Sequence, residues 1–136
     1  MGEEGQVIPR IMVFEDDRLT QLMVEKQVLK ELPHAQLEFR DQVYTAAPEI
    51  LSFKPHAIIM DFQFNRHTSA CLIPFLYKME IETYFYTSSP ELVRKVCLEA
   101  LGSVPKFIHV YSKQSHRPVV FRRIRKYLET IKCLRA

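Results

Sequence analysis

Acidic side chains follow two short apolar runs of this sequence, and a lysine follows a third. Glu15 and Asp16 come directly after RIMVF, and Asp61 comes directly after AIIM. Lys113 comes shortly after KFIHVY. Short apolar runs bounded by turn residues are typical of strands buried in a parallel sheet. The carboxyl ends of such strands meet at one rim, so we expect the three carboxylates and the ammonium group to converge there.

Converging carboxylates raise one another's pKa, and they stay ionised only if a cation neutralises them. Mg²⁺ is the natural choice, because it takes oxygen ligands and tolerates a few carboxylates plus waters. Lys113 would add a compact positive charge, and Thr87, after another predicted strand, would add a hydroxyl. This set fits phosphoryl transfer to Asp61, which would form an acyl phosphate. Thr87 could then move toward the phosphoryl group as a switch.

Five predicted strands alternate with five predicted helices. The strands are 10–14, 35–39, 57–60, 81–86 and 106–111, and the helices are 19–32, 43–53, 70–79, 90–101 and 118–134. Strict alternation favours an α/β fold, with a parallel sheet between two layers of helices and right-handed crossovers. Two of the helices have uncertain starts. The second could begin at Pro48, with the proline at an early position, and Pro74 could either lie in the first turn of the third helix or kink it. Ser89 before Pro90 is expected to cap the fourth helix, and Gly102 to end it.

The first helix is expected to bury an apolar stripe at helical spacing. The stripe consists of Leu19, Leu22, Met23, Leu29 and Leu32.

Composition places the chain among ordinary globular domains. The 136 residues are 47% hydrophobic and 26% charged, and a net charge of +3 makes a nucleic-acid partner unlikely on charge alone. The three cysteines are far apart and odd in number, which favours reduced, mostly buried thiols and a cytoplasmic location. No apolar run has the length of a signal peptide or a membrane span. We expect a disordered leader at 1–8 and one domain at 9–136.

Four motifs, in order, resemble the receiver domain of response regulators in two-component signalling. They are IMVFEDD, IIMDF, YTSS and YSK, and the resemblance covers about residues 9–133. It implies a flavodoxin-like, doubly wound, five-stranded parallel sheet of order 2-1-3-4-5 with five helices. The chain would then be a stand-alone receiver, similar to the chemotaxis regulators.

The resemblance also implies the roles of the site residues. Asp61 becomes the phosphoacceptor, and Asp16 and Asp61 bind Mg²⁺ directly with the backbone carbonyl of Gln63. Glu15 acts mainly through water. The protein would assist its own phosphorylation and dephosphorylation rather than act as an enzyme on other substrates.

Further positions of the family pattern fall outside the acidic group. Thr87 would be the switch hydroxyl and Lys113 the phosphate-binding lysine. Gln63 and Ser89 fall where the family tunes how fast the phosphate is lost.

The resemblance implies two kinds of protein partner. A histidine kinase or a histidine phosphotransfer domain would donate the phosphoryl group. A downstream protein would bind the face made by the fourth helix, fifth strand and fifth helix. The chain would be a monomer or a weak homodimer that pairs through the fourth and fifth helices. No membrane is expected among its partners. The basic outer side of the last helix is either solvated or a further partner surface.

Several positions depart from the family pattern. Asn65 stands where a proline is usual, Ser69 where a glycine is usual, and Gln114 where a proline follows the lysine. The aromatic residue expected three places before the lysine is Val110, with Tyr111 next to it. An alternative function is therefore a phosphorylation-independent, receiver-like interaction domain.

Other readings of these residues stay open from sequence. A hydrolase with an Asp nucleophile would want a second acid two residues after Asp61, where Gln63 stands. Glu15 and Asp16 could be acids at a helix start, and Lys113 could be a solvated loop residue. Thr87 could be a turn residue only.

Overall fold

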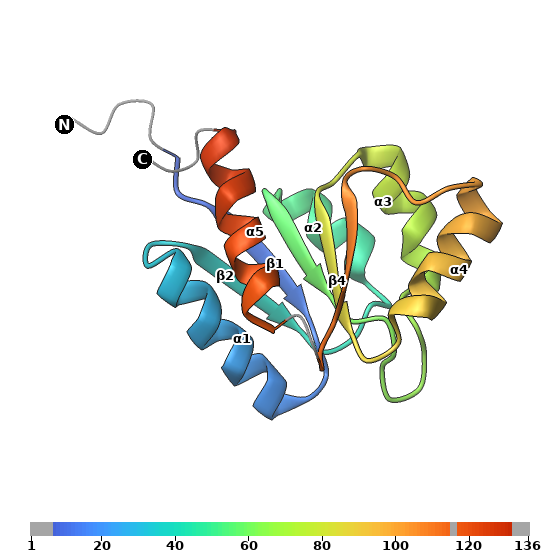
Figure 1. Cartoon of the computed structure of the whole chain (residues 1–136), viewed down its shortest axis with the longest axis horizontal. Helices are drawn as coiled ribbons and strands as arrows, with labels where there is room; N and C mark the ends of the chain where they lie inside the picture. The colour runs from blue at the N-terminus through green and yellow to red at the C-terminus, as the bar shows by residue number, and fades with distance from the viewer. Residues whose placement is uncertain (1–6, 115–116, 132–136) are drawn as a thin grey trace.

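The computed structural model describes residues 7–114 and 117–131, which form a five-stranded parallel sheet with helices on both faces (Figure 1). The strands are β1 (Arg10–Phe14), β2 (Gln36–Arg40), β3 (Ala57–Met60), β4 (Thr83–Thr87) and β5 (Ile108–Ser112). The helices are α1 (Arg18–Glu31), α2 (Ala46–Phe53), α3 (Ile73–Met79), α4 (Pro90–Leu101) and α5 (Arg117–Thr130), with a 3₁₀ turn η1 (Ala70–Leu72) before α3. The strand order β2-β1-β3-β4-β5 confirms the predicted topology.

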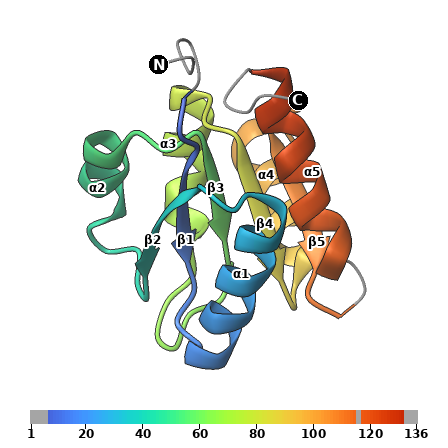
Figure 2. The same ribbon diagram turned by 90° about the vertical axis from the view of Figure 1, so that its left-hand side faces the viewer.

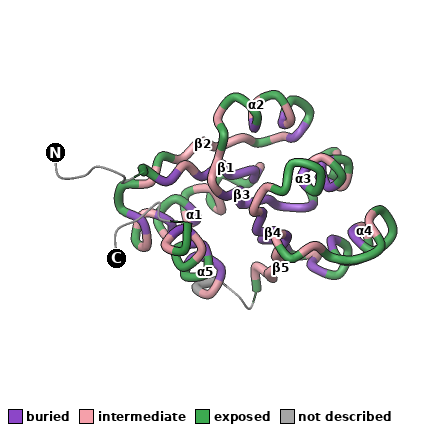
Figure 3. Tube along the Cα trace, turned by 90° about the horizontal axis from the view of Figure 1, so that it is seen from above, coloured by how far each residue is buried: buried purple, intermediate pink, exposed green. Residues whose placement is uncertain are grey.

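The helices form two layers, with α1 and α5 on one face of the sheet and α2, α3 and α4 on the other (Figures 2 and 3). Side chains alternate along β1, so that Ile11 packs toward Val24 of α1 and Phe121 of α5. Met12 packs in the opposite direction, toward Ile50 of α2. Because both faces are covered, every residue of β3 is buried, which explains its uninterrupted apolar sequence.

The ends of several elements differ from the prediction by one to three residues. β4 begins at Thr83 instead of 81, because the backbone of Ile81 completes the end of α3 by donating to the Leu76 carbonyl. Glu80 makes this turn with a left-handed φ of 52°. Pro48 and Pro74 both lie in first turns, where the missing N–H costs nothing. The 118–134 prediction extends beyond the described residues.

The predicted buried stripe of α1 is wrong in part. Leu19 is 76% exposed, whereas Val24 and Val28 are buried together with Leu32. Valines at an i, i+4 spacing face the sheet, whereas Leu19 and Leu22 lie toward solvent. Of the cysteines, Cys97 is buried as expected, Cys71 is exposed, and Cys133 lies outside the described residues, as do residues 1–6 of the predicted leader.

The register of the strands brings the predicted site residues to one level. Phe14 of β1 pairs with Met60 of β3, so Glu15 and Asp61 both follow directly on paired residues. Thr87 of β4 pairs with Ser112 of β5, and Lys113 comes next. No helix in the described ranges combines the length and the apolar character that crossing a membrane would require.

Candidate functional site

Lys113 joins two buried carboxylates at the carboxyl ends of the strands. Its Nζ lies 2.7 Å from Glu15 Oε1 and 2.8 Å from Asp61 Oδ2. Glu15 is 3% exposed and Asp61 is 6% exposed. The backbone N–H of Lys113 donates to the Thr87 carbonyl over 2.9 Å, which holds the chain beside β4 as it leaves β5. Residues that are 98 positions apart in sequence are thus in direct contact.

The second oxygen of each buried acid accepts a backbone hydrogen bond. Phe62 N–H donates to Asp61 Oδ1 over 2.7 Å, and Asp17 N–H donates to Glu15 Oε2 over 3.0 Å. Burial raises the pKa of Glu15 above its ordinary value, although the bonds from Lys113 and Asp17 act in the opposite direction. Burial alone would lower the pKa of Lys113, but its bonds to Asp61 and Glu15 outweigh burial and raise it. Lys113 is therefore an ammonium ion at neutral pH.

Asp16 completes an acidic cluster that could hold a metal ion. One carboxylate oxygen each from Glu15, Asp16 and Asp61 lies within 4.8 Å of the others. The set contains only oxygen donors, which suits a hard divalent cation. Three carboxylates face one ammonium group, so the cluster keeps an excess of negative charge that such a cation would neutralise. The residues present therefore fit the metal that the acidic pattern predicted.

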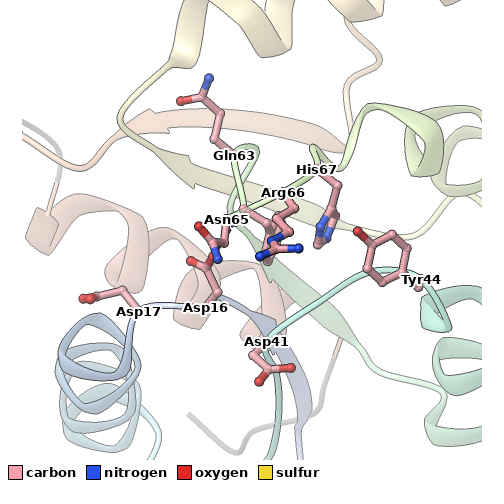
Figure 4. A pocket seen from close by; sticks show the side chains of 9 residues that line it. Asp16, Asp17, Asp41, Tyr44, Gln63, Asn65, Arg66 and His67 are labelled. Atoms are coloured by element: carbon pink, nitrogen blue, oxygen red, sulfur yellow. Dashed lines mark hydrogen bonds between the residues drawn. The ribbon is translucent and has the colours of Figure 1, made fainter.

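An open groove of about 680 Å³ leads to Asp16 (Figure 4). It lies between the connection from β2 to α2 and the loop 62–69 that follows β3. Its lining residues are Asp16, Asp17, Asp41, Tyr44, Gln63, Phe64, Asn65, Arg66 and His67. Asp61 is buried and is not one of these lining residues, so it is Asp16 that connects the acidic cluster to the groove.

The Thr87 hydroxyl lies at the same rim but bonds to its own loop. Thr87 is 1% exposed, and its Oγ1 accepts from Ser89 N–H over 3.1 Å. Ser89 is the N-cap residue of α4, as predicted, but its hydroxyl makes no capping bond to the helix and donates instead to Gln63 Oε1 over 3.0 Å. This bond connects the loop after β3 with the loop after β4.

Val110 and Tyr111 lie on opposite faces of the sheet. Val110 packs against the core on the α2, α3 and α4 side, whereas Tyr111 packs against the core on the α1 and α5 side. Successive residues of a strand always alternate in this way. Tyr111 therefore does not replace the aromatic ring that the family pattern expects at position 110.

Ser69, which departs from the glycine usual in the family pattern, has a structural role that its residue type alone did not predict. Its hydroxyl is buried and donates to the carbonyl oxygen of Asp61 over 2.8 Å. His67, one of five histidines scattered along the sequence without the spacing of metal ligands, lines the groove and stacks on Phe64 with ring centroids 4.9 Å apart. An isolated histidine carries no pattern that could have shown this.

No protein-family model and no curated protein matches the sequence. Solved structures do match. The signal receiver domain of an HD domain-containing protein from Pseudomonas fluorescens Pf-5 is 16% identical, with a TM-score of 0.68 over 90% of this chain and 96% of that one. The beryllofluoride-activated receiver domain of DrrB, a Thermotoga maritima protein, is 16% identical, with a TM-score of 0.62 over 90% of this chain and 99% of that one.

A further match is the PhyR stress response regulator, which is 17% identical with a TM-score of 0.63. The match covers 90% of this chain but only 46% of PhyR. The chain thus spans about half the length of that regulator and nearly the whole of the two isolated receiver domains. The protein has the fold of a response-regulator receiver domain, as the four motifs implied.

Proposed function

We propose that this protein is a phosphoacceptor in a two-component phosphorelay, modified on Asp61. The observation that carries the proposal is the contact of Lys113 Nζ with both Glu15 and Asp61, beside a third carboxylate from Asp16. A solvated loop lysine and acids at a helix start would have no reason to meet in this way. The receiver fold of the neighbours supports the same interpretation.

The donor would be a phosphohistidine on a histidine kinase or a histidine phosphotransfer domain. An Asp61 oxygen attacks phosphorus, a P–O bond forms, and the P–N bond breaks. The imidazole nitrogen leaves with the bonding electron pair and takes up a proton. The product is an aspartyl phosphate, which water later hydrolyses at phosphorus to restore the carboxylate.

The chain's own groups would position this reaction. Lys113, which already bonds Asp61 Oδ2, is placed to bind oxygens of the transferred group. Asp16, Asp61, Glu15 and the Gln63 carbonyl would hold Mg²⁺, which neutralises charge on the phosphoryl oxygens when bound. Thr87 would release Ser89 N–H to bind the phosphoryl group, and that movement would reach a partner face on α4, β5 and α5.

Intact-mass measurement after incubation with acetyl phosphate and Mg²⁺ tests the proposal. We expect the wild-type chain to gain one phosphoryl group and Asp61→Asn to gain none. Asp41→Asn is the matched control, because Asp41 lines the groove but does not belong to the acidic cluster. The proposal is wrong if the wild type gains no mass and also binds no beryllofluoride, the analogue present in the activated DrrB domain.

Val110 supports a second candidate, a receiver-like interaction domain that works without phosphorylation. The family's rotating aromatic ring is missing on the α4 side of β5, so a phosphoryl group would have less to move there. This candidate predicts identical amide exchange in α4, β5 and α5 with and without beryllofluoride. A clear change in those segments would favour the first candidate.

A further inference from the structure

Asp16 differs from the other two acids of the cluster because it has no cationic partner among the described residues. Lys113 bonds Glu15 and Asp61, whereas none of the salt bridges within 7–114 and 117–131 involves Asp16. The Asp16 side chain is also the most accessible of the three, since it lines the groove. Repulsion from two neighbouring carboxylates therefore favours its rotation away into water.

The backbone N–H of Asn65 opposes that rotation. It donates to Asp16 Oδ2 over 2.7 Å and connects residues 49 positions apart. The two residues lie side by side at the rim of the groove (Figure 4). A hydrogen bond to an ionised group is stronger than one between neutral groups, and this one leaves the second oxygen, Oδ1, without a described protein donor.

The loop 62–69 holds the Asn65 N–H in place. Ser69 closes it by donating its hydroxyl to the Asp61 carbonyl and its N–H to the Phe62 carbonyl, each over 2.8 Å. Phe64 N–H then donates to the His67 carbonyl over 2.8 Å, so that Asn65 and Arg66 form the tip of a tight turn. The direction of the donor is therefore set by bonds that begin at the phosphoacceptor residue itself.

The His67 side chain fixes the same turn to the rest of the protein. Its ring lies against Phe64 and against Tyr44, with centroids 4.9 Å and 4.3 Å away. Its Nε2 accepts from Val43 N–H over 3.3 Å. The connection from β2 to α2 thus supports the turn from the groove side.

We infer that the Asn65 backbone N–H is a positioning group that keeps the Asp16 carboxylate gathered with Glu15 and Asp61 for a divalent cation. Proline, the residue that the receiver pattern would place at 65, has no N–H and could not make this bond. The inference rests on the metal-binding part of the proposed function. It assigns a role to the turn that does not depend on the Asn65 side chain.

Calorimetric titration with Mg²⁺ of two variants tests the inference. Asn65→Pro removes the N–H, and Asn65→Ala keeps it while removing the side chain. We expect Asn65→Pro to bind Mg²⁺ about 3- to 10-fold more weakly than the wild type, which is the range of an ordinary hydrogen bond and less than that of a bond to a buried charged group, because water competes here. We expect Asn65→Ala to bind as the wild type does. Equal affinity of the two variants, or tighter binding by Asn65→Pro, would overturn the inference.

A measurement on the metal-free wild type covers the case in which Asn65→Pro does not fold. The ¹⁵N–¹H resonance of Asn65 should be shifted downfield and slow to exchange. Asp16→Ala should move it upfield and speed its exchange. An Asn65 amide that does not respond to Asp16→Ala would show that the bond is not formed, and the inference would fall.

The two proposals can fail separately. If the wild type binds Mg²⁺ with the expected Asn65→Pro effect but gains no phosphoryl group, the phosphorelay function is wrong and the positioning role stands. If the wild type gains the phosphoryl group while Asn65→Pro keeps full Mg²⁺ affinity, only the positioning role is wrong.

Discussion

At the carboxyl ends of the strands Lys113 faces three carboxylates, whereas at the amino ends of β4 and β5 a single carboxylate, Glu82, has several polar partners. His109 Nε2 lies 2.6 Å from Glu82 Oε2, and the Tyr84 hydroxyl donates to the same oxygen over 3.2 Å. The Tyr84 ring also stacks on His109, with centroids 4.4 Å apart. Arg123 and Lys126 of α5 line the small cavity beside this group.

The comparison shows why only one of the two ends suits cation-dependent chemistry. Both ends bury ionisable groups between neighbouring strands. At the amino ends the acid has hydrogen-bonding partners. Burial, and after it the neighbouring Glu82, raise the pKa of Tyr84, so the phenol stays a neutral donor. At the carboxyl ends negative charge exceeds positive charge, and a groove gives access to it. An excess of negative charge that solvent can reach therefore distinguishes the candidate site, whereas the burial of ionisable groups is common to both ends.

The largest effect is expected from Lys113→Met, which removes the cation from the carboxyl end. Two nearly buried carboxylates would lose their partner, and we expect the free energy of unfolding at pH 7 to fall by about 2–4 kcal/mol. Urea unfolding measures the loss. Mg²⁺ should restore more stability to this variant than it adds to the wild type, and an equal gain in both proteins would contradict the proposed metal site.

A smaller loss is expected at high pH, and it should depend on the same lysine. The pKa of Lys113 is raised above its ordinary 10.5, so its contribution is complete below that pH and disappears as pH rises through the folded-state value. Wild-type stability should therefore fall above about pH 10.5. The Lys113→Met variant should not show the part of this fall that comes from deprotonation of Lys113. If the stability of the two proteins fell in parallel above about pH 10.5, the stabilising role of the Lys113 ammonium group would be wrong.

Glu82→Gln tests the amino ends and should cost about 1 kcal/mol, because the amide can still bond His109. Phosphoryl transfer from acetyl phosphate should be unchanged, as Glu82 lies at the other end of the sheet. Thermal unfolding and intact mass give the two readouts. A loss of phosphorylation in a folded variant would mean that the two ends are coupled.

The smallest effect is expected from Tyr84→Phe, which removes one hydroxyl from the buried stack. Its bond to Glu82 is the longer of the two, so we expect a loss of about 0.5–1 kcal/mol in urea unfolding. Stacking on His109 should survive. A loss of stability as large as that of Lys113→Met would show that Glu82 depends on the Tyr84 hydroxyl much more than on His109.

The positions of the strands and the topology could be predicted because strands that are buried on both faces have continuous apolar sequences. Continuous apolar residues at Ala57–Met60 predicted β3, and strict alternation predicted the parallel sheet. Element ends were less predictable. The start of β4 depended on how Ile81 completes α3, and that bond has no sequence pattern of its own.

Residue type and order along the chain were enough to propose that Glu15, Asp16, Asp61 and Lys113 belong to one site, because parallel strands bring their carboxyl ends together. Only the tertiary structure decided which acids the lysine contacts and which one accepts a hydrogen bond from the Asn65 N–H. Such assignments require the path of a loop and the direction of one backbone donor. Neither is encoded in residue type, since every residue except proline carries the same N–H.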